Sequence, residues 1–341
     1  MIYRQREPLI KFTPEGIYCP TGDFYIDPMR PVSKALITHA HADHARWGMK
    51  KYIAHKFTKS ILHSRLSEPA DVQGVEYDEV LSINGVKVSF HPAGHVIGSA
   101  QIRLEYRGFV TVISGDYKLE NDGISTPFEP IRCHEFVSES TFGLPIYRWD
   151  PQNVQKDELK RWVELNQKQG KTSVFVGYSL GKAQRLMKML EGSGQLFVHR
   201  SIGTLNEAFR NAGVVLPDYT EQDFFSDLRH LEGKIVLVPP ALLDSNVIKK
   251  IPHAAVGLCS GWMRVRGSRR WRSADRGFAI SDHADWQGLI RAVTHTEAQH
   301  VYVTHGQTEV FARYLRETGI SASAVPVFGN SEKREEDAQV D

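Results

Sequence analysis

The sequence predicts an α/β protein in which one domain, formed by residues 1–140 and 278–330, is interrupted by an α/β insertion over residues 141–277. Short β-branched and aromatic runs separated by tight turns fill the first third of the chain, which indicates strands. From Pro151 onward strands alternate with helical segments, an order typical of a mostly parallel sheet covered by helices. After Arg276 strand ends carrying histidines return, and they complete a site that begins in the first segment.

The first segment is expected to consist of short strands joined by hairpins. An Asn84-Gly85 pair lies between two strand-like runs and predicts a two-residue turn, and Arg107-Gly108 marks another turn. The expected strands span residues 24–28, 34–38, 51–55, 86–93, 101–106 and 109–114.

The insertion is expected to alternate helices with buried strands. Pro151 stands where the first turn of a helix tolerates it, while Gly192 and Gly213 end the two helices that follow. The expected helices span residues 151–169, 180–192 and 201–213, and the expected strands residues 172–179, 194–199, 234–240 and 254–262. Strand-and-loop segments are expected at residues 277–286 and 300–307, and the charged tail, residues 331–341, is expected to be disordered.

The overall composition is that of an ordinary soluble globular protein and excludes several classes. No apolar run approaches the roughly 18–20 residues that cross a bilayer, and the N-terminus lacks the apolar core of a secretory signal. Cys19, Cys133 and Cys259 are too few and too widely spaced for a disulfide framework or a thiolate zinc site, so we expect a reducing cytoplasm. A formal net charge of +2 excludes a dedicated DNA-packaging protein but leaves room for a local basic path.

The loop after the strand at residues 34–38 carries four metal-ligand side chains within six residues. We expect His39 and His41 to point at one metal ion. Asp43 and His44, at the start of a following helix, are expected to point at a second ion about 3.5–4 Å away, the spacing of two-metal hydrolases. Imidazole and carboxylate ligands without a thiolate suit Zn²⁺ or Mn²⁺ in a site open to water.

Further ligands are expected at three later strand ends. His95 follows a strand in a glycine-flanked loop, Asp116 follows the next strand pair, and His305 ends a strand near the C-terminus. The expected coordination places His39, His41 and His95 on one ion and Asp43, His44 and His305 on the other, with Asp116 bridging. His91 is either a residue that supports a ligand or an ordinary strand histidine, and the second interpretation is preferred.

Two other features point to proton transfer and to support of the ligands. Glu139 lies at a strand end, and His283 lies beside aspartates, so that a histidine oriented by a carboxylate can protonate a leaving oxyanion. With Asp43 and Asp116, these two residues make up the expected catalytic set. Asp27 is expected to orient a ligand histidine, and Asp23 is the alternative for that role.

The motifs resemble those of a known superfamily. THAHADHARWG, AGHVIGS and SGDYK are similar to the second, third and fourth motifs of the metallo-β-lactamase superfamily, and Asp27 resembles the first. SESTFG, SDHADW and VTHGQ resemble motifs A, B and C of the β-CASP nucleases, which include RNA-processing and Artemis-type DNA repair enzymes. The block YCPTGDFYIDPMRPVSKALITHAHADHARWG is similar to the N-terminal block of the bacterial ligase-associated DNA exonucleases.

This resemblance implies a metallo-β-lactamase αβ/βα four-layer sandwich with residues 141–277 inserted as a β-CASP α/β cap, and an active site in the cleft between them. It implies that Glu139 orients His283, and it suggests a functional partnership with an ATP-dependent DNA ligase and a helicase. His305 is the residue found in RNA-processing members at motif C, where Artemis-type enzymes usually carry valine. The resemblance also suggests that residues of GYSLGKAQRL face the substrate, namely Ser179, Lys182 and Gln184.

A basic segment with interleaved tryptophans precedes motif B. Arginines neutralise phosphates and an aromatic ring can stack an unpaired base, so this segment is a candidate path for a single strand; the alternative is a solvated loop. The candidate contacts are Arg264, Arg266, Arg269, Arg270 and Trp271, with Trp262, Arg272 and Arg276 nearby.

The leading hypothesis is a two-metal DNA exonuclease that acts in repair on single-stranded DNA or free ends. The same chemistry on RNA is the first alternative. A third hypothesis, a hydrolase of small thioesters or lactams, is disfavoured because such an enzyme needs neither the Glu139-His283 pair nor a long cap. A fourth, a non-catalytic binding subunit, is disfavoured because such a subunit does not require the full set of ligands.

Overall fold

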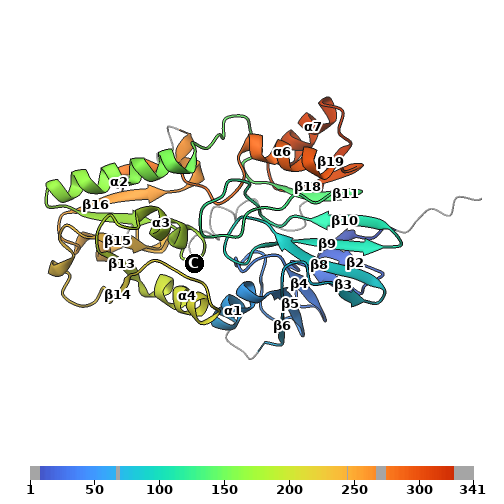
Figure 1. Cartoon of the computed structure of the whole chain (residues 1–341), viewed down its shortest axis with the longest axis horizontal. Coiled ribbons are helices and arrows are strands. Elements are labelled where there is room, and N and C mark those ends of the chain that lie inside the picture. The colour runs from blue at the N-terminus through green and yellow to red at the C-terminus, as the bar shows by residue number, and fades with distance from the viewer. Residues whose placement is uncertain (1–7, 67–69, 244, 266–273, 326–341) are drawn as a thin grey trace, which may run out of the picture.

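Three β-sheets form the framework of the computed structural model (Figure 1). The structure describes residues 8–66, 70–243, 245–265 and 274–325. We refer to the sheets as sheet A, sheet B and sheet C in the order in which the chain enters them.

Sheet A has six strands in the order β1-β2-β3-β4-β5-β6, and β3 to β6 run parallel. The strands are β1 Lys11–Thr13, β2 Gly16–Cys19, β3 Phe24–Ile26, β4 Ala35–Ile37, β5 Tyr52–His55 and β6 Val72–Val75. All three side chains of β4 are buried, as expected for a parallel strand covered on both faces. Helix α1, Lys56–Arg65, starts directly after β5, and the His55 side chain caps its first turn.

Sheet B has seven strands in the order β19-β18-β11-β10-β9-β8-β7. The strands are β7 Leu81–Ile83, β8 Val86–Pro92, β9 Ala100–Tyr106, β10 Phe109–Ile113, β11 Glu135–Ser140, β18 His300–Gly306 and β19 Ala322–Ala324. β11 pairs in parallel with β10 on one side and with β18 on the other. The chain therefore returns after the insertion to the sheet that its first segment built.

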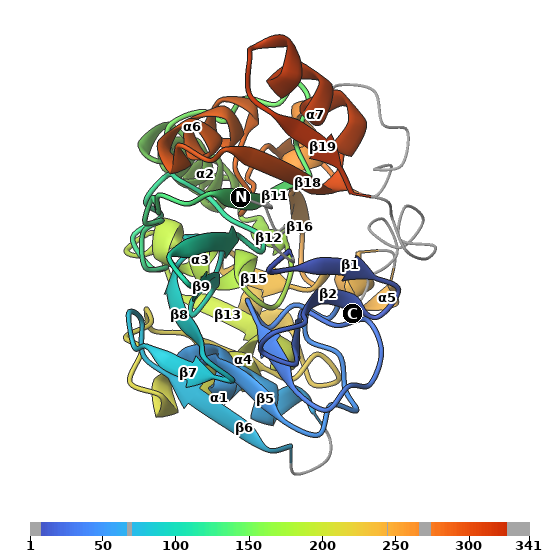
Figure 2. The same cartoon turned by 90° about the vertical axis from the view of Figure 1, so that its right-hand side faces the viewer.

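Sheets A and B pack face to face through a shared apolar core. Ile26 and Leu36 of sheet A meet Phe90 and Ile102 of sheet B in one buried cluster. Helices α6, Trp286–Thr296, and α7, Thr308–Glu317, cover the other face of sheet B beside β18 and β19 (Figure 2). Helix α1 covers the other face of sheet A.

Sheet C lies in the insertion and is parallel throughout, with the order β14-β13-β15-β12-β16-β17. Its strands are β12 Thr172–Val176, β13 Leu196–His199, β14 Thr220–Gln222, β15 Ile235–Val238, β16 Ala254–Cys259 and β17 Arg276–Phe278. Its helices are α2 Gln152–Lys168, α3 Lys182–Leu190, α4 Arg200–Asn211 and α5 Asn246–Lys249. Apolar side chains fill both faces of this sheet, which forms the left half of the molecule in Figure 1.

The insertion packs against the first segment through helices. Leu205 and Phe209 of α4 share a buried cluster with Ile61 and Leu62 of α1. Figure 1 shows these two helices side by side at the lower junction of the halves. The two halves are thus joined by an apolar contact as well as by the chain itself.

The prediction of an α/β protein is confirmed, and so are several of its elements. Asn84 and Gly85, both with positive φ, form the predicted two-residue turn between β7 and β8, with Ile83 opposite Val86. The three helices expected in the insertion are present as α2, α3 and α4, between the expected parallel strands.

Other expectations need correction. Helices α1, α6 and α7 are present but were not among the elements predicted from the sequence. The helix expected to begin at Asp43 does not form, because this part of the chain makes only a turn. β17 pairs with β16, so sheet C includes Phe278, one residue past the expected boundary. No helix in the described residues is both long and apolar enough to cross a membrane.

Candidate metal centre

The ends of several strands meet at one edge of sheet B. β8 and β10 both run antiparallel to β9, and β10, β11 and β18 are mutually parallel, so these four strands end at the same edge. Beyond these ends lie His95 and Asp116, and in their last positions lie Glu139 and His305. The loop that starts at His39 leaves β4 of sheet A toward the same place. In α/β proteins the carboxyl ends of strands are where ligands bind.

The loop after β4 is fixed by bonds at both ends. The Thr38 backbone N–H donates to one Asp27 oxygen at 2.8 Å, and the Thr38 hydroxyl donates to the other at 2.6 Å. Ala45 N–H donates to the His41 carbonyl at 2.8 Å, which closes a single helical turn. At the far end, the Tyr52 hydroxyl bonds two backbone groups of the loop. The loop is therefore held without a following helix.

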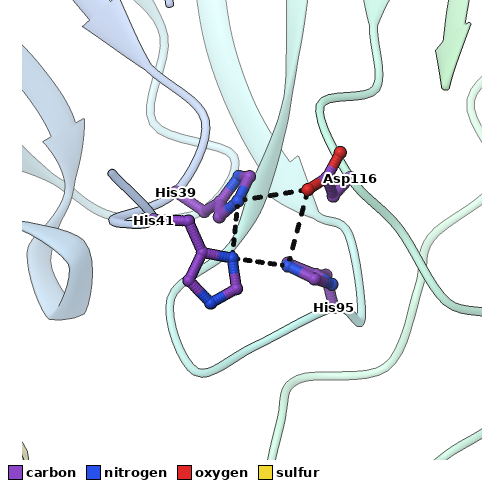
Figure 3. Close-up of side chains that lie close together, drawn as sticks. All are labelled: His39, His41, His95 and Asp116. Carbon is purple, nitrogen blue, oxygen red and sulfur yellow. Dashed lines mark hydrogen bonds and ion pairs between the residues drawn. The ribbon is translucent and has the colours of Figure 1, made fainter. Parts of the chain in front are cut away.

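Four side chains form the first group of the centre (Figure 3). His41 Nδ1 lies 3.1 Å from both His39 Nε2 and His95 Nε2. Asp116 Oδ2 lies 3.4 Å from His39 Nε2 and 3.7 Å from His95 Nε2. Ligand atoms around one ion lie about 3–3.5 Å apart when each metal–ligand distance is near 2.1 Å. The group thus has the spacing of a metal-binding set.

A second group shares Asp116 with the first. His44 Nε2 lies 3.5 Å from Asp116 Oδ2 and 3.6 Å from Asp43 Oδ2. The rings of His44 and His305 stack with their centroids 5.2 Å apart. His305 has a φ of 50°, in the left-handed region, and its carbonyl accepts a bond from the Ser140 hydroxyl. The structure thus brings all seven expected ligands to one place, with Asp116 between the two groups.

The ligand histidines are oriented by bonds on their far sides. His41 Nε2 donates to the Leu180 carbonyl at 3.2 Å, and His95 Nδ1 donates to the Asp282 carbonyl at 2.8 Å. A carbonyl oxygen can only accept, so these nitrogens carry the hydrogen of a neutral ring and the opposite nitrogens present their lone pairs to the cluster. Both carbonyls come from outside the first segment, so the insertion and motif B help to build the centre.

Asp27, rather than Asp23, supports a ligand. His44 Nδ1 donates to Asp27 Oδ2 at 2.7 Å, which turns Nε2 toward Asp43 and Asp116. Asp23 instead accepts from the Tyr18 hydroxyl at 2.9 Å, in an exposed turn. Of the two residues proposed for this role from the sequence, the geometry favours Asp27.

The charges of the site suit metal binding. Burial lowers the pKa of His41 to about 4 and holds the pKa of His95 well below its ordinary value. Burial would raise the pKa values of Asp43 and Asp116, but the surrounding histidines, His44 first, outweigh it and bring the pKa of Asp43 to about 2 and that of Asp116 well below its usual range. Burial would lower the pKa of His44, yet the aspartates around it hold that pKa well above its ordinary value, so a metal displaces a proton there.

Glu139 and His283 form a pair beside the ligands. The two Glu139 carboxylate oxygens lie 3.1 and 3.0 Å from His283 Nδ1, and Glu139 also accepts from the Tyr117 N–H at 2.8 Å. The His283 ring is 4.6 Å from the ring of His95. Burial would lower the pKa of His283, but Glu139 and then Asp116 raise it to about 9. The arrangement is that of an acid held in place by a carboxylate.

Known proteins with similar sequences process nucleic acids, as their names state. The chain is 29% identical over 319 residues, 93% of its length, to a probable DNA ligase of Opitutus terrae. It is 26% identical over 168 residues, 46% of its length, to the cleavage and polyadenylation specificity factor 73 of Drosophila melanogaster. It is 28% identical over 122 residues, 35% of its length, to the endoribonuclease YSH1 of Saccharomyces cerevisiae. These matches agree with the resemblance to the β-CASP nucleases that the sequence motifs carry.

These three relatives are much longer than the matched regions. The chain spans 31% of the probable DNA ligase, 24% of the fly factor and 15% of the yeast endoribonuclease. No family model matches the chain. A crystal structure of a protein of unknown function from Enterococcus faecalis superposes with a TM-score of 0.61 at 15% identity, covering 87% of this chain and 80% of that one, and thus shares the fold.

A buried ion group, not predicted from the sequence, joins the insertion to the segment that carries motif B. Asp282 Oδ2 lies 2.9 Å from Lys182 Nζ and its Oδ1 lies 3.4 Å from Arg185 Nη1, and all three side chains are buried. Lys182 also donates to the Ile280 carbonyl at 2.8 Å, and Arg185 donates to the Ser281 carbonyl. Ion pairs and hydrogen bonds from helix α3 therefore hold the segment that carries His283 in place. The only sequence signal was two cations at the start of a helix.

Of the residues expected to face the substrate from GYSLGKAQRL, Lys182 and Gln184 are buried and Ser179 is half-buried. Lys182 is used in the ion group, and Gln184 is buried, where it bonds Asn206 and the backbone of its own turn. The Ser179 hydroxyl bonds the Ser201 hydroxyl at 2.8 Å. These side chains shape the insertion in this structure.

The basic segment is only partly described. Arg264 pairs with Asp150 at 3.3 Å, and Arg276 pairs with Glu158 at 2.6 Å. Arg266, Arg269, Arg270, Trp271 and Arg272 lie outside the described residues. Trp262 packs on Phe142 with ring centroids 4.8 Å apart. The single-strand path along this segment stays a prediction.

Proposed function

We propose that the chain is a two-metal nuclease that hydrolyses phosphodiester bonds of DNA, acting as a repair exonuclease beside an ATP-dependent DNA ligase and a helicase. One observation carries the proposal: His39, His41, His95 and Asp116 present ligand atoms that all lie within 4.8 Å of one another, in a chain that matches a probable DNA ligase over 93% of its length. A cytoplasmic location is part of the proposal and agrees with three buried free cysteines.

In this proposal His39, His41 and His95 hold one divalent ion, Asp43, His44 and His305 hold another, and Asp116 lies between them. Nitrogen and oxygen donors without thiolate fit Zn²⁺ or Mn²⁺. The buried His44 Nε2 has no hydrogen-bond partner in the described chain, as expected of an atom that serves a metal. When bound, such ions supply Lewis-acid stabilisation of the negative charge that builds up on the phosphodiester.

His283 is the proposed proton donor. Glu139 holds its Nδ1, which leaves Nε2 to pass a proton to the leaving oxygen. In the metal-free chain the pKa of His283 is about 9, held up first by Glu139, so the ring carries a proton at neutral pH. Glu139 is itself fixed by the Tyr117 N–H, so the pair is positioned before substrate arrives.

The order of layers supports a metallo-β-lactamase αβ/βα sandwich within this proposal. Helix α1, sheet A, sheet B and the pair α6 and α7 follow one another, and sheet C with its helices would form the β-CASP cap. Residues 1–140 and 278–330 then make the catalytic domain and residues 141–277 the cap, with Phe278 added to the cap by its strand pairing.

DNA is proposed over RNA because of the extent of the matches. The probable DNA ligase aligns with 93% of the chain, whereas the yeast endoribonuclease aligns with 35%. RNA is the second candidate, and His305 favours it, since RNA-processing β-CASP members carry histidine at motif C. A small thioester or lactam hydrolase would leave the Glu139–His283 pair without a purpose.

The test uses end-labelled single-stranded DNA and RNA of one sequence, with Zn²⁺ or Mn²⁺ added in turn. We expect progressive loss of DNA from one end, abolished in Asp43→Ala and retained in Asp23→Ala, a matched aspartate in the same block outside the centre. Preferential loss of RNA would replace DNA by RNA as the substrate. Equal activity in Asp43→Ala and the unaltered chain would contradict the proposed centre.

A further inference from the structure

A second group of a histidine and two carboxylates lies apart from the metal centre. It consists of His91 on β8, Asp78 in the connection between β6 and β7, and Glu129 in the segment between β10 and β11. His91 Nδ1 lies 2.8 Å from Asp78 Oδ1 and 3.5 Å from Glu129 Oε1. Three segments that are distant in sequence thus present ligand-type atoms to one point.

The spacing of these atoms fits one divalent ion. Zn²⁺ binds histidine nitrogen and carboxylate oxygen at about 2.0–2.2 Å, which puts neighbouring ligand atoms roughly 3–3.5 Å apart. The two separations at His91 Nδ1 lie close to that range. The His91 side chain is 12% exposed, while those of Asp78 and Glu129 are 67% and 45% exposed, so water can complete the coordination.

His91 Nδ1 has a feature that it shares with the metal centre. Despite its short distance to Asp78, this buried nitrogen makes no hydrogen bond of acceptable geometry. In the described chain, His44 Nε2 is the other buried histidine nitrogen of this kind, and it lies 3.6 Å from Asp43 and 3.5 Å from Asp116, whereas His91 Nδ1 lies 2.8 Å from Asp78 and 3.5 Å from Glu129. Each of the two nitrogens thus faces two carboxylates, as a metal-binding nitrogen in a mixed histidine and carboxylate site does.

The surrounding structure holds the group in position. The Ser89 hydroxyl lies 2.9 Å from His91 Nε2 and fixes the ring, the kind of support that metal-binding histidines use. Asp78 N–H donates to the Phe90 carbonyl at 2.9 Å, and Glu129 N–H donates to the Pro92 carbonyl at 3.1 Å. Both carboxylate residues are therefore pinned by backbone bonds to the same strand that carries His91.

We propose that Asp78, His91 and Glu129 form a separate site for one divalent ion of the Zn²⁺ class. The ion would link the β6–β7 connection and the segment after Asp116 to β8. It would thereby restrain the chain that follows Asp116, a proposed ligand of the metal centre. This site stands on its own geometry and does not depend on the proposed nuclease activity.

The test counts metal ions in purified chains equilibrated with Zn²⁺ alone, by mass spectrometry of the metal. We expect His91→Asn to hold one ion fewer per chain than the unaltered protein, and Asp71→Asn, an exposed carboxylate outside these groups, to hold the same number. The difference is independent of how many ions the metal centre binds. Failure of the nuclease proposal therefore leaves this result unaffected.

A second variant covers the case in which His91→Asn does not fold. Asp78→Asn combined with Glu129→Gln alters only the two more exposed side chains, and its folding is checked by circular dichroism. This double variant should also lose one ion, and Zn²⁺ should raise its Tm by less than it raises the Tm of the unaltered chain. An unchanged ion count in the folded double variant would overturn the proposal and leave His91 as the centre of an ordinary ion pair.

Discussion

Replacing Asp282 by asparagine tests the buried ion group most severely. The change keeps the size of the side chain but leaves Lys182 and Arg185 buried without the carboxylate that lies 2.9 and 3.4 Å from them. Removing one partner of a buried ion pair typically costs about 3–5 kcal/mol, because the remaining charge stays desolvated. Both cations keep bonds to backbone carbonyls, so we expect a loss near the lower end, roughly 3 kcal/mol.

The assay is urea denaturation in chelator, which separates the stability of the chain from metal binding. Glu105→Gln is the matched control, since it removes an acid that pairs with Lys87 and Arg103 near the surface of sheet B. Exposed pairs contribute about 0–1 kcal/mol, so the control should change the free energy of unfolding by less than that. A loss below about 1 kcal/mol in Asp282→Asn as well would refute the reasoning.

Three further predictions concern single side chains. Glu139→Gln should lower the pKa of His283 from about 9, because the carboxylate is the largest charge that raises it, and NMR titration of the chelator-treated protein measures this. Burial lowers the pKa of His55 from its ordinary value of 6.5 to about 4. The contribution of His55 to the free energy of unfolding is therefore complete above pH 6.5 and is lost as the pH drops toward 4. His55→Asn, which keeps a capping side chain, should lose less stability than the unaltered chain between pH 7 and 5 in urea titrations. Trp47, three residues after His44, is 80% exposed and can stack a base. Trp47→Ala should therefore weaken the binding of single-stranded DNA by roughly 1–3 kcal/mol, as measured by fluorescence anisotropy. Unchanged affinity would exclude base stacking on this ring.

Local patterns predicted the parts of the fold that local physics decides. The Asn84-Gly85 turn follows from backbone preferences of two residues, and α2 follows from its periodic apolar side chains. Helix α1 was missed because it begins at Lys56, directly after β5, and only the strand was predicted from this stretch of the sequence. The helix expected at Asp43 does not form because hydrogen bonds to Asp27, before the loop, and to Tyr52, after it, hold the loop in another conformation.

More of the ligand residues could be predicted from the sequence than of the residues that orient them. The ligand types and their positions after strands were readable, but the bonds that orient them were not. Lys182 was expected to face the substrate and Arg185 carried no prediction, whereas the packing of α3 places both beside Asp282, about a hundred residues away. Arg264 likewise finds Asp150 across 114 positions. Such pairs depend on tertiary structure, which the sequence pattern alone does not reveal.

The central claim is that one sheet edge holds two divalent ions bridged by Asp116. Anomalous diffraction from crystals soaked in Zn²⁺ or Mn²⁺ tests it most directly. The account predicts two peaks about 3.5–4 Å apart, one beside His39, His41 and His95 and the other beside Asp43, His44 and His305, with Asp116 between them. A single peak, or none, at these residues in crystals that bind the metal elsewhere would contradict it.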